Sequence, residues 1–357
     1  MRTIEPGEDV AHHRDILYAH ARAVRRRVGW IAALAAILVV SVVLDLMTGP
    51  AWLGAGEVVR SLLTGGSGGA TADVVVWQVR LPTACLAVLV GASLSLAGTE
   101  MQTILRNPLA SPFTLGVSSA AAFGAALAIV LGISLPLVPE AFAVPANAFV
   151  FAFGAVMLIQ LIATVRGEDG SALILFGIAM VFTFNALVSA IQFVAPAASL
   201  QELVFWTMGG LGRADRVSVF ATAAVFCLVL PFSLAAAVRL TLLELGEERA
   251  RSLGVSLQRL RFGCLARASL LAATAVAFAG TIGFVGLVGP HVARLMVGDD
   301  HRLLLPASIL SGAAIMSLSS IAAKLVLPGV IMPIGIVTTL VGLPFFVMLL
   351  FGRRRRG

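Results

Sequence analysis

Two histidines are the residues in this sequence that could support the most kinds of chemistry. His291 and His301 could ligate a metal or relay protons, because imidazole titrates near neutral pH and binds transition metals. They have no third ligand nearby, so their spacing does not favour a metal site. Cys85, Cys227 and Cys264 form no CxxC pair and lie in or beside apolar stretches. We therefore interpret the histidines as polar residues near helix ends and predict no metal site.

The sequence contains no convincing motif for phosphate binding or for hydrolysis. Lys324 is the only lysine, and it does not belong to a GxxxxGK loop followed by Ser or Thr, so the sequence predicts no ATP-binding loop. We find no HExxH motif and no carboxylate pair suited to acid-base catalysis. We expect no catalytic residues here, and any ATP-driven activity would require a separate ATPase polypeptide.

Three ionisable side chains fall within or at the ends of apolar stretches: Asp45, Glu100 and Lys324. A charge in hydrocarbon is costly unless it faces protein or water. Each of these residues is therefore a candidate for a transport pathway or for a structural ion pair.

The composition indicates which solvent surrounds these residues. The chain has 357 residues, of which 59% are hydrophobic and 12% are charged, and its mean hydropathy is +1.01. A soluble domain carries about 25% charged residues. The net charge of +7 does not indicate nucleic acid, because no polar stretch is long enough for a nucleic-acid module. We predict an all-α polytopic membrane protein, since backbone groups in lipid must pair within helices.

Apolar runs long enough to cross a hydrocarbon core of about 30 Å recur along the chain. The eighth run is short for a full span, and residues 196–216 could dip into the membrane instead of lying outside it. The predicted transmembrane segments, about ten in all, lie at residues 28–48, 81–104, 117–135, 142–165, 171–195, 217–239, 262–282, 284–297, 304–327 and 334–351.

The distribution of basic residues predicts the orientation. We expect 1–27 to be a cytoplasmic segment, 28–352 the membrane domain and 353–357 a basic cytoplasmic tail. Both termini then lie in the cytoplasm, and most basic residues are on that side, as the positive-inside rule requires. The basic residues that remain at the outer face are Arg60, Arg80, Arg213, Arg216 and Lys324.

The stretch at residues 80–127 joins a helix of small residues to a proline-rich turn. It reads RLPTACLAVLVGASLSLAGTEMQTILRNPLASPFTLGVSSAAAFGAAL. Small residues allow close helix packing in lipid. Pro108 ends the helix and pushes Asn107 out of the helical region, and Arg106 anchors this inner-face turn.

This stretch resembles the FecCD family of permeases, which includes importers of iron siderophores, haem and vitamin B12. The family carries an RLPR start, a Q...NPLAxP turn and an LGxxxGA helix. Two positions depart from the family pattern: Thr83 replaces the usual second arginine, and Ala120 replaces a glycine. The resemblance continues through later segments and covers residues from about 28 to 352.

The loop at 241–261 is the longest polar inner segment between the predicted helices. Its acidic residues come first and its basic residues later, with a glycine after them, which is the pattern of a short helix. The similarity to the family's LGeexArsLG stretch implies that this helix contacts an ATPase subunit. The matching positions are Glu247, Arg249, Ala250, Leu253 and Gly254.

Glycines recur at intervals of three in the block that begins at Gly280. On a helix this spacing makes a bare stripe that suits tight packing or a helix break. The block resembles the family's GxIgFVGLxxPHxxRxxxGxDHR sequence. We assign to the pathway or to helix packing Gly283, Gly286, Pro290 and His291.

The last block resembles the family's C-terminal ELPxGxxTxxxGxPfFxxLL segment, with departures at its outer end. Ser319 and Ser320 replace an Ala-Asp pair, Lys324 replaces an arginine, and Ile331 replaces an acidic residue. By the resemblance, cations at the outer face meet carboxylates of a substrate-binding protein. Arg80 is the first candidate for that contact, and Lys324 is the second.

The resemblance implies an ATP-binding cassette importer of ferric siderophore in a bacterial cytoplasmic membrane, with haem or vitamin B12 as the other possible cargoes. It implies a second permease subunit, identical or paralogous, two ATPase subunits and a periplasmic or lipid-anchored binding protein. ATP and magnesium would bind the ATPase, and this chain would hold no cofactor. An ion-coupled secondary transporter is the other class considered, and the scarcity of intramembrane acids counts against it.

Overall fold

A computed structural model describes residues 6–49, 53–66, 71–166, 170–327 and 329–352 of the chain, without side chains at 6–21, 163–166, 170–174 and 349–352. All regular secondary structure in these ranges is helical, which confirms the all-α prediction. The predicted basic tail at 353–357 lies outside the described residues.

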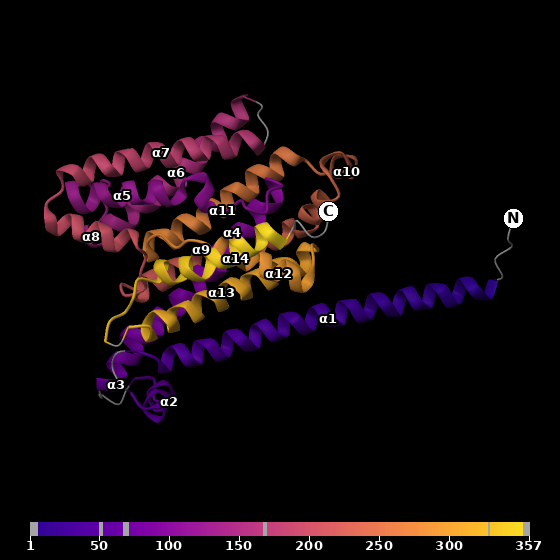
Figure 1. Cartoon of the computed structure of the whole chain (residues 1–357), viewed down its shortest axis with the longest axis horizontal. Coiled ribbons are helices and arrows are strands. Elements are labelled where there is room, and N and C mark those ends of the chain that lie inside the picture. Colours follow the sequence, from indigo (N-terminus) through magenta and orange to yellow (C-terminus); the bar gives the residue numbers. More distant parts are fainter. Residues whose placement is uncertain (1–5, 50–52, 67–70, 167–169, 328, 353–357) are drawn as a thin grey trace.

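The helices follow one another with short connections (Figure 1). In chain order they are α1 (Pro6–Met47), α2 (Ala55–Leu63), α3 (Thr71–Val74), η1 (Val75–Arg80), α4 (Leu81–Ile104), η2 (Pro112–Leu115), α5 (Val117–Leu131), η3 (Glu140–Phe142), α6 (Ala143–Arg166), α7 (Gly170–Val194), α8 (Ala197–Thr207), α9 (Arg216–Glu244), α10 (Glu247–Ser252), α11 (Leu257–Ala279), α12 (Val285–Val297), α13 (His301–Leu325) and α14 (Ile334–Gly352).

The number of membrane-crossing helices agrees with the sequence. Seven helices among the described residues are long and apolar enough to span a membrane, and they come from α1, α4, α6, α7, α9, α11 and α13. Three shorter apolar helices, Val117–Leu131, Val285–Val297 and Ile334–Met348, correspond to the remaining predicted segments. The prediction of about ten is confirmed, with the eighth segment short as expected.

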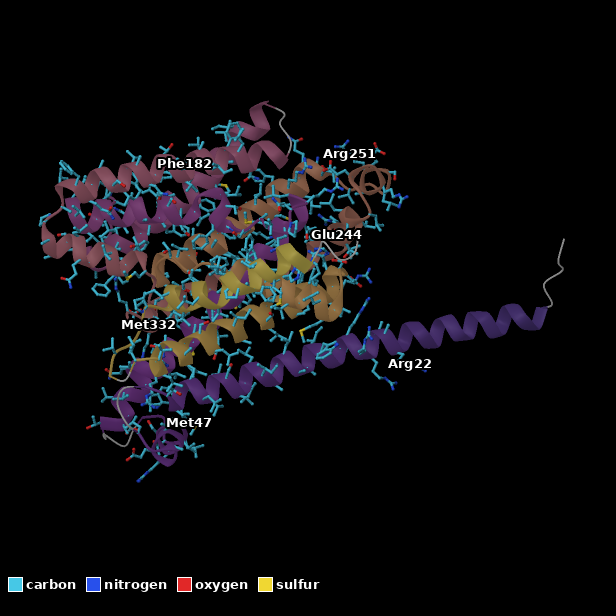
Figure 2. The ribbon with its side chains drawn as sticks, viewed as in Figure 1. Arg22, Met47, Phe182, Glu244, Arg251 and Met332 are labelled. Atoms are coloured by element: carbon cyan, nitrogen blue, oxygen red, sulfur yellow. The ribbon has the colours of Figure 1, made fainter. Side chains whose placement is uncertain are left out.

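The two ends of the bundle differ in their side chains, as Figure 2 shows. Arg22, Glu244 and Arg251 lie toward one end, and Met47 and Met332 lie toward the other. Helix α1 starts earlier than the predicted segment, and its N-terminal half projects from the bundle at the first of these ends. This end carries α10 and corresponds to the predicted cytoplasmic side.

Helix α4 lies at the centre and packs against α9, α11, α12 and α13. Every residue from Val90 to Leu105 is buried. Helix association in lipid depends on close packing, because lipid chains are as apolar as the helix surface. Glycines provide that closeness: a methyl group at Gly98 would overlap the backbone of Gly286 in α12, and one at Gly91 would overlap Gly312 in α13.

Residues 196–216, for which the sequence left open a dip into the membrane or a position outside it, pack against the bundle. Helix α8 packs beside α5, and the turn after it lies against the end of α11. There Gly210 donates its amide proton to the carbonyl oxygen of Ala279 at 2.8 Å. This turn brings the end of α8 next to the break between α11 and α12.

Replacing Gly98 by alanine should destabilise the protein by roughly 1–3 kcal/mol, because the added methyl group overpacks a contact between two backbones. Thermal unfolding in detergent, followed by size-exclusion chromatography, measures the change. Gly154→Ala in α6 is the matched control, since nothing lies within 4 Å of the place that its added methyl group would take. Equal melting temperatures for both variants would contradict this account of the α4 contact.

Candidate functional site

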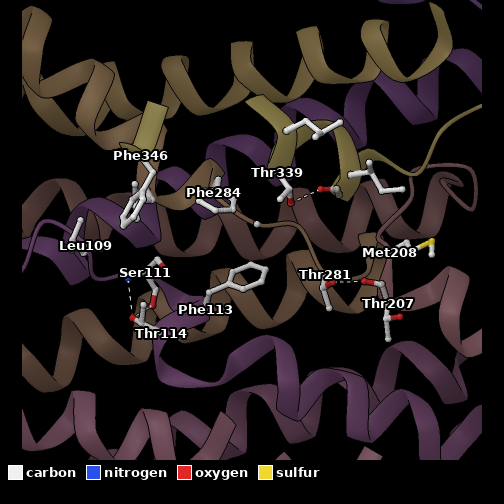
Figure 3. Close-up of a pocket in the computed structure, with 15 residues that line it drawn as sticks. Leu109, Ser111, Phe113, Thr114, Thr207, Met208, Thr281, Phe284, Thr339 and Phe346 are labelled. Atoms are coloured by element: carbon white, nitrogen blue, oxygen red, sulfur yellow. Dashed lines mark hydrogen bonds between the residues drawn. The ribbon is translucent and has the colours of Figure 1, made fainter. Parts of the chain in front are cut away.

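A cleft of about 650 Å³ lies between η2, the end of α8, the α11–α12 break and α14. Figure 3 shows side chains from all four segments around it. It brings together stretches that are far apart in the sequence.

The shape of the cleft comes from two breaks in helical backbone. Ser111 and Thr114 hold η2 through a hydrogen bond from the Ser111 amide to Thr114 Oγ1 at 3.1 Å. Between α11 and α12 the chain turns at Gly280 and Phe284, which have φ angles of 69° and 65°. A positive φ is uncommon for a bulky residue such as Phe284. The turn places its ring at the cleft, 6.4 Å from the ring centroid of Phe346.

The lining combines aromatic rings with hydroxyl groups. Phe113, Phe284 and Phe346 supply the rings. The hydroxyl-bearing residues are Ser111, Thr114, Thr207, Thr281 and Thr339. No lining side chain is charged, and the described residues hold no cluster of three or more potential His, Cys, Asp or Glu metal ligands. Such a surface binds by shape and hydrogen bonding.

Most of these hydroxyls give their protons to nearby backbone. Thr114 donates to the Ser111 carbonyl at 2.7 Å, and Thr339 donates to the Gly335 carbonyl at 2.7 Å. Thr207 and Thr281 also donate to carbonyl oxygens. A hydroxyl that has donated its proton still has lone pairs. The cleft is therefore richer in acceptors than in donors.

The glycines of the block that begins at Gly280 have two roles: one lines the cleft, and another allows close helix packing. Gly283 lines the cleft, and the nearest atom to a methyl group there would be Thr339 Oγ1 at 3.6 Å. Gly286 faces α4 instead, where a methyl group would lie 2.9 Å from the Leu94 carbonyl oxygen. Pro290 is buried within α12, and the His291 ring packs edge-on against Phe345 at 5.7 Å.

His301 is fully buried at the start of α13. One ring nitrogen lies 2.7 Å from Thr103 Oγ1 of α4, and its amide donates to Thr241 Oγ1 of α9 at 2.9 Å. It thus joins three helices, as a structural polar residue at a helix end would.

The inner-face turn has the form expected from its proline. Arg106 is exposed, with a φ of 48°. The amide of Asn107 donates to the Gln102 carbonyl at 3.1 Å, and its side-chain oxygen accepts from the Leu109 amide at 2.9 Å. Pro108 follows, so these contacts close the end of α4.

Helix α10 forms within the polar loop, as predicted. Glu247 holds it to α11 through Arg261 at 2.6 Å and reaches Arg251 at 3.5 Å. Ala250 is fully buried, whereas Leu253 is 59% exposed. The exposed residues of this anchored turn include Arg249, Arg251, Leu253 and Gly254.

Neither Arg80 nor Lys324, the two candidates for contact with a binding protein, has an exposed side chain. Arg80 is buried and donates to the carbonyl oxygens of Leu46 and Met47 at 2.8 and 3.2 Å. These carbonyls end α1 and have no partner in their own helix. Lys324 pairs with the Asp45 carboxylate at 2.7 Å, and its side chain is 7% exposed. Contact with a binding protein through these two residues stays a prediction, and their observed role is to tie α1 to its neighbours.

A second buried ion pair was only half visible in the sequence. Glu100 was singled out from the sequence as an ionisable residue in an apolar stretch, but its partner Arg267 was not. Arg267 donates from Nε and Nη2 to the Glu100 carboxylate at 3.1–3.2 Å, joining α11 to α4. An arginine within the apolar segment 262–282 was the available signal. Asp45, Glu100 and Lys324, the three ionisable residues that the sequence places within or at the ends of apolar stretches, are therefore all in structural ion pairs.

The sequence matches the FecCD transport family over residues 37–352. The chain belongs to that family. It is 35% identical over 335 residues to the vitamin B12 import system permease protein BtuC of Citrobacter koseri, covering 93% of this chain and 96% of that protein.

Two further similarities support FecCD membership. The chain is 34% identical over 282 residues to the hemin transport system permease protein HmuU of Yersinia pestis, covering 79% of this chain and 84% of that one. A solved transporter of the metal-chelate type in an inward-facing conformation is 33% identical, with a TM-score of 0.78, covering 91% of this chain and 99% of the other.

FecCD membership defines the activity at the level of the family. The chain is a permease subunit of a type II ATP-binding cassette importer and a multi-pass protein of the cytoplasmic membrane. It is not itself an enzyme, because ATP hydrolysis belongs to a separate subunit. Permeases of this family work with an ATPase and a substrate-binding protein. The ion-coupled class of transporter is therefore excluded.

Gly254→Val should uncouple transport while the protein still inserts and folds. Gly254 has a φ of 84°, and a left-handed conformation costs an L-residue about 1–2 kcal/mol. ATP-driven uptake in proteoliposomes should fall strongly. Gly132→Val is the control, because Gly132 also has a positive φ, 64°, and open space around it, but ends α5. Wild-type uptake by Gly254→Val would show that the shape of α10 does not matter for coupling.

Lys324→Met should destabilise the protein by about 3–5 kcal/mol, because it leaves the buried Asp45 carboxylate without its cation. Combining it with Asp45→Asn removes both charges and should restore most of the lost stability. Melting temperatures of the single and double variants in detergent measure the effect. A double variant no more stable than Lys324→Met would argue against this pairing.

Proposed function

We propose that this permease imports a ferric siderophore, with vitamin B12 as the second candidate. The acceptor-rich, uncharged cleft carries the proposal. A siderophore supplies all the ligands of its iron, so the permease needs no metal-binding side chains.

The hydroxyl pattern of the cleft distinguishes among chelates. Thr281 and Thr339 give their protons to carbonyl oxygens and keep lone pairs for a ligand. Thr114 also gives its proton to a carbonyl oxygen but keeps one lone pair, because it accepts from the Ser111 amide. Amide or hydroxyl donors of a siderophore would satisfy these lone pairs. Haem carries two carboxylates and no peripheral donors, so it suits this lining less well. Cobalamin has amide donors, which keeps it as the second candidate.

We infer that a second permease subunit, identical or paralogous, completes the pathway. Helix α14 forms one wall of the cleft, and it also carries exposed apolar side chains. Leu340 and Met348 are 65% and 71% exposed. A partner subunit would cover this apolar row and enclose the cleft.

Energy and substrate would come from other subunits. Two ATPase subunits, which hold ATP and magnesium, would bind at α10, and this chain would bind no cofactor of its own. A periplasmic or lipid-anchored binding protein would deliver the chelate to the opposite end. Rocking of the two permeases would then open the cleft to each side in turn.

Uptake by proteoliposomes that contain the permease with its ATPase and binding protein tests the cargo. We expect ATP-dependent accumulation of a ⁵⁵Fe-labelled siderophore, unaffected by a protonophore, and little uptake of haem or cobalamin. Thr339→Val should weaken siderophore uptake severalfold, because it removes an acceptor at nearly constant volume. ATP-dependent uptake of cobalamin or haem in place of the siderophore would overturn the cargo and leave the family assignment intact.

A further inference from the structure

A second hollow lies away from the cleft, between α1, α4 and α9. Its volume is about 530 Å³, within the range of about 300–1,000 Å³ found for small-molecule sites. Val39 and Val42 of α1, Leu81 and Cys85 of α4, and Val219 of α9 line it. We call it the α1 groove. All three helices are candidate membrane spans.

The α1 groove lies in the outer half of the membrane. Its α4 wall begins at Leu81, directly after η1 at the outer end, and reaches Leu89. At 1.5 Å per residue this wall is about 12 Å long. One leaflet contributes about half of a 30 Å hydrocarbon core. The groove therefore spans most of the depth of the outer leaflet.

The surface of the groove suits a hydrocarbon chain. Its lining is apolar, and the Cys85 thiol is the most polar side-chain group in it. Water needs two to four polar partners to occupy a cavity stably. Val39 is 63% exposed, so the chain itself leaves this wall open. An acyl chain is the apolar molecule that surrounds such a surface in a membrane.

The α9 wall of the groove belongs to a helix that begins with a cation. Arg216 is exposed and begins α9, one helical turn before Val219. Residues three apart share a helix face, and side chains lean toward the N-terminus of their helix. The guanidinium can thus reach up to the headgroup level. The neighbouring Asp215 carboxylate is engaged as the helix cap, accepting from the Ser218 amide at 2.8 Å.

From these observations we propose that the α1 groove binds one phospholipid of the outer leaflet. An acyl chain lies between α1, α4 and α9, and the phosphate pairs with Arg216. The arginine fork matches phosphate oxygens. The lipid fills the space beside α1, which packs on its other side along α13. This site is independent of the cargo carried through the cleft.

Native mass spectrometry of the full chain, titrated in detergent with palmitoyl-oleoyl phosphatidylglycerol, tests the site. Val39→Trp should fill the groove and weaken binding of the first lipid at least tenfold. Val40→Trp is the matched control, because Val40 is 58% exposed and does not line the groove. Wild type and the control should each hold one tightly bound lipid.

The headgroup contact has its own test. Arg216→Gln should weaken binding about fivefold, the factor expected for one cation near an anionic headgroup, whereas Arg213→Gln in the preceding turn should have little effect. Equal lipid binding by Val39→Trp and Val40→Trp overturns the proposal. So does an Arg216→Gln variant that binds as tightly as wild type, or crosslinking of Val39→Cys to another protein subunit in the assembled transporter.

Discussion

The close approach of α4 to α12 and α13 is the contact on which the rest of the fold depends. Gly98 and Gly286 bring the backbones of α4 and α12 together without side chains between them. Gly91 and Gly312 do the same for α4 and α13. Because α12 is held this tightly, the chain before it must turn sharply at Phe284, and that turn forms a wall of the cleft. The shape of the cleft thus depends on packing on the opposite face of α12.

The charged side chains that pair between the helices do not line the cleft. Asp45 with Lys324, and Glu100 with Arg267, are paired between helices, whereas the cleft presents rings and hydroxyls. A cleft without charged side chains exerts no strong local attraction on what enters it. The paired charges instead fix which helices are neighbours. The ion pairs and the cleft therefore use different residue types in different places.

Local patterns could be predicted from the sequence, and distant pairings could not. Hydropathy located the spans, and the order of acids, bases and Gly254 located α10. The burial of Lys324 and Arg80 could not be predicted, because the sequence shows a cation near an outer helix end but not the α1 carbonyls and carboxylate that it contacts. The cleft was missed for the same reason: Thr207, Thr281 and Thr339 meet only after three separate segments fold together.

The burial of α4 also sets the order in which the protein can be completed. Glu100 enters the membrane early, but its partner Arg267 comes 167 residues later in the chain. At synthesis rates of about 5–20 residues per second, the carboxyl group waits roughly 8–33 seconds for its cation. During that interval the central helix has neither its ion pair nor its glycine contacts. The contacts that bury α4 therefore become available only as the last third of the protein is made.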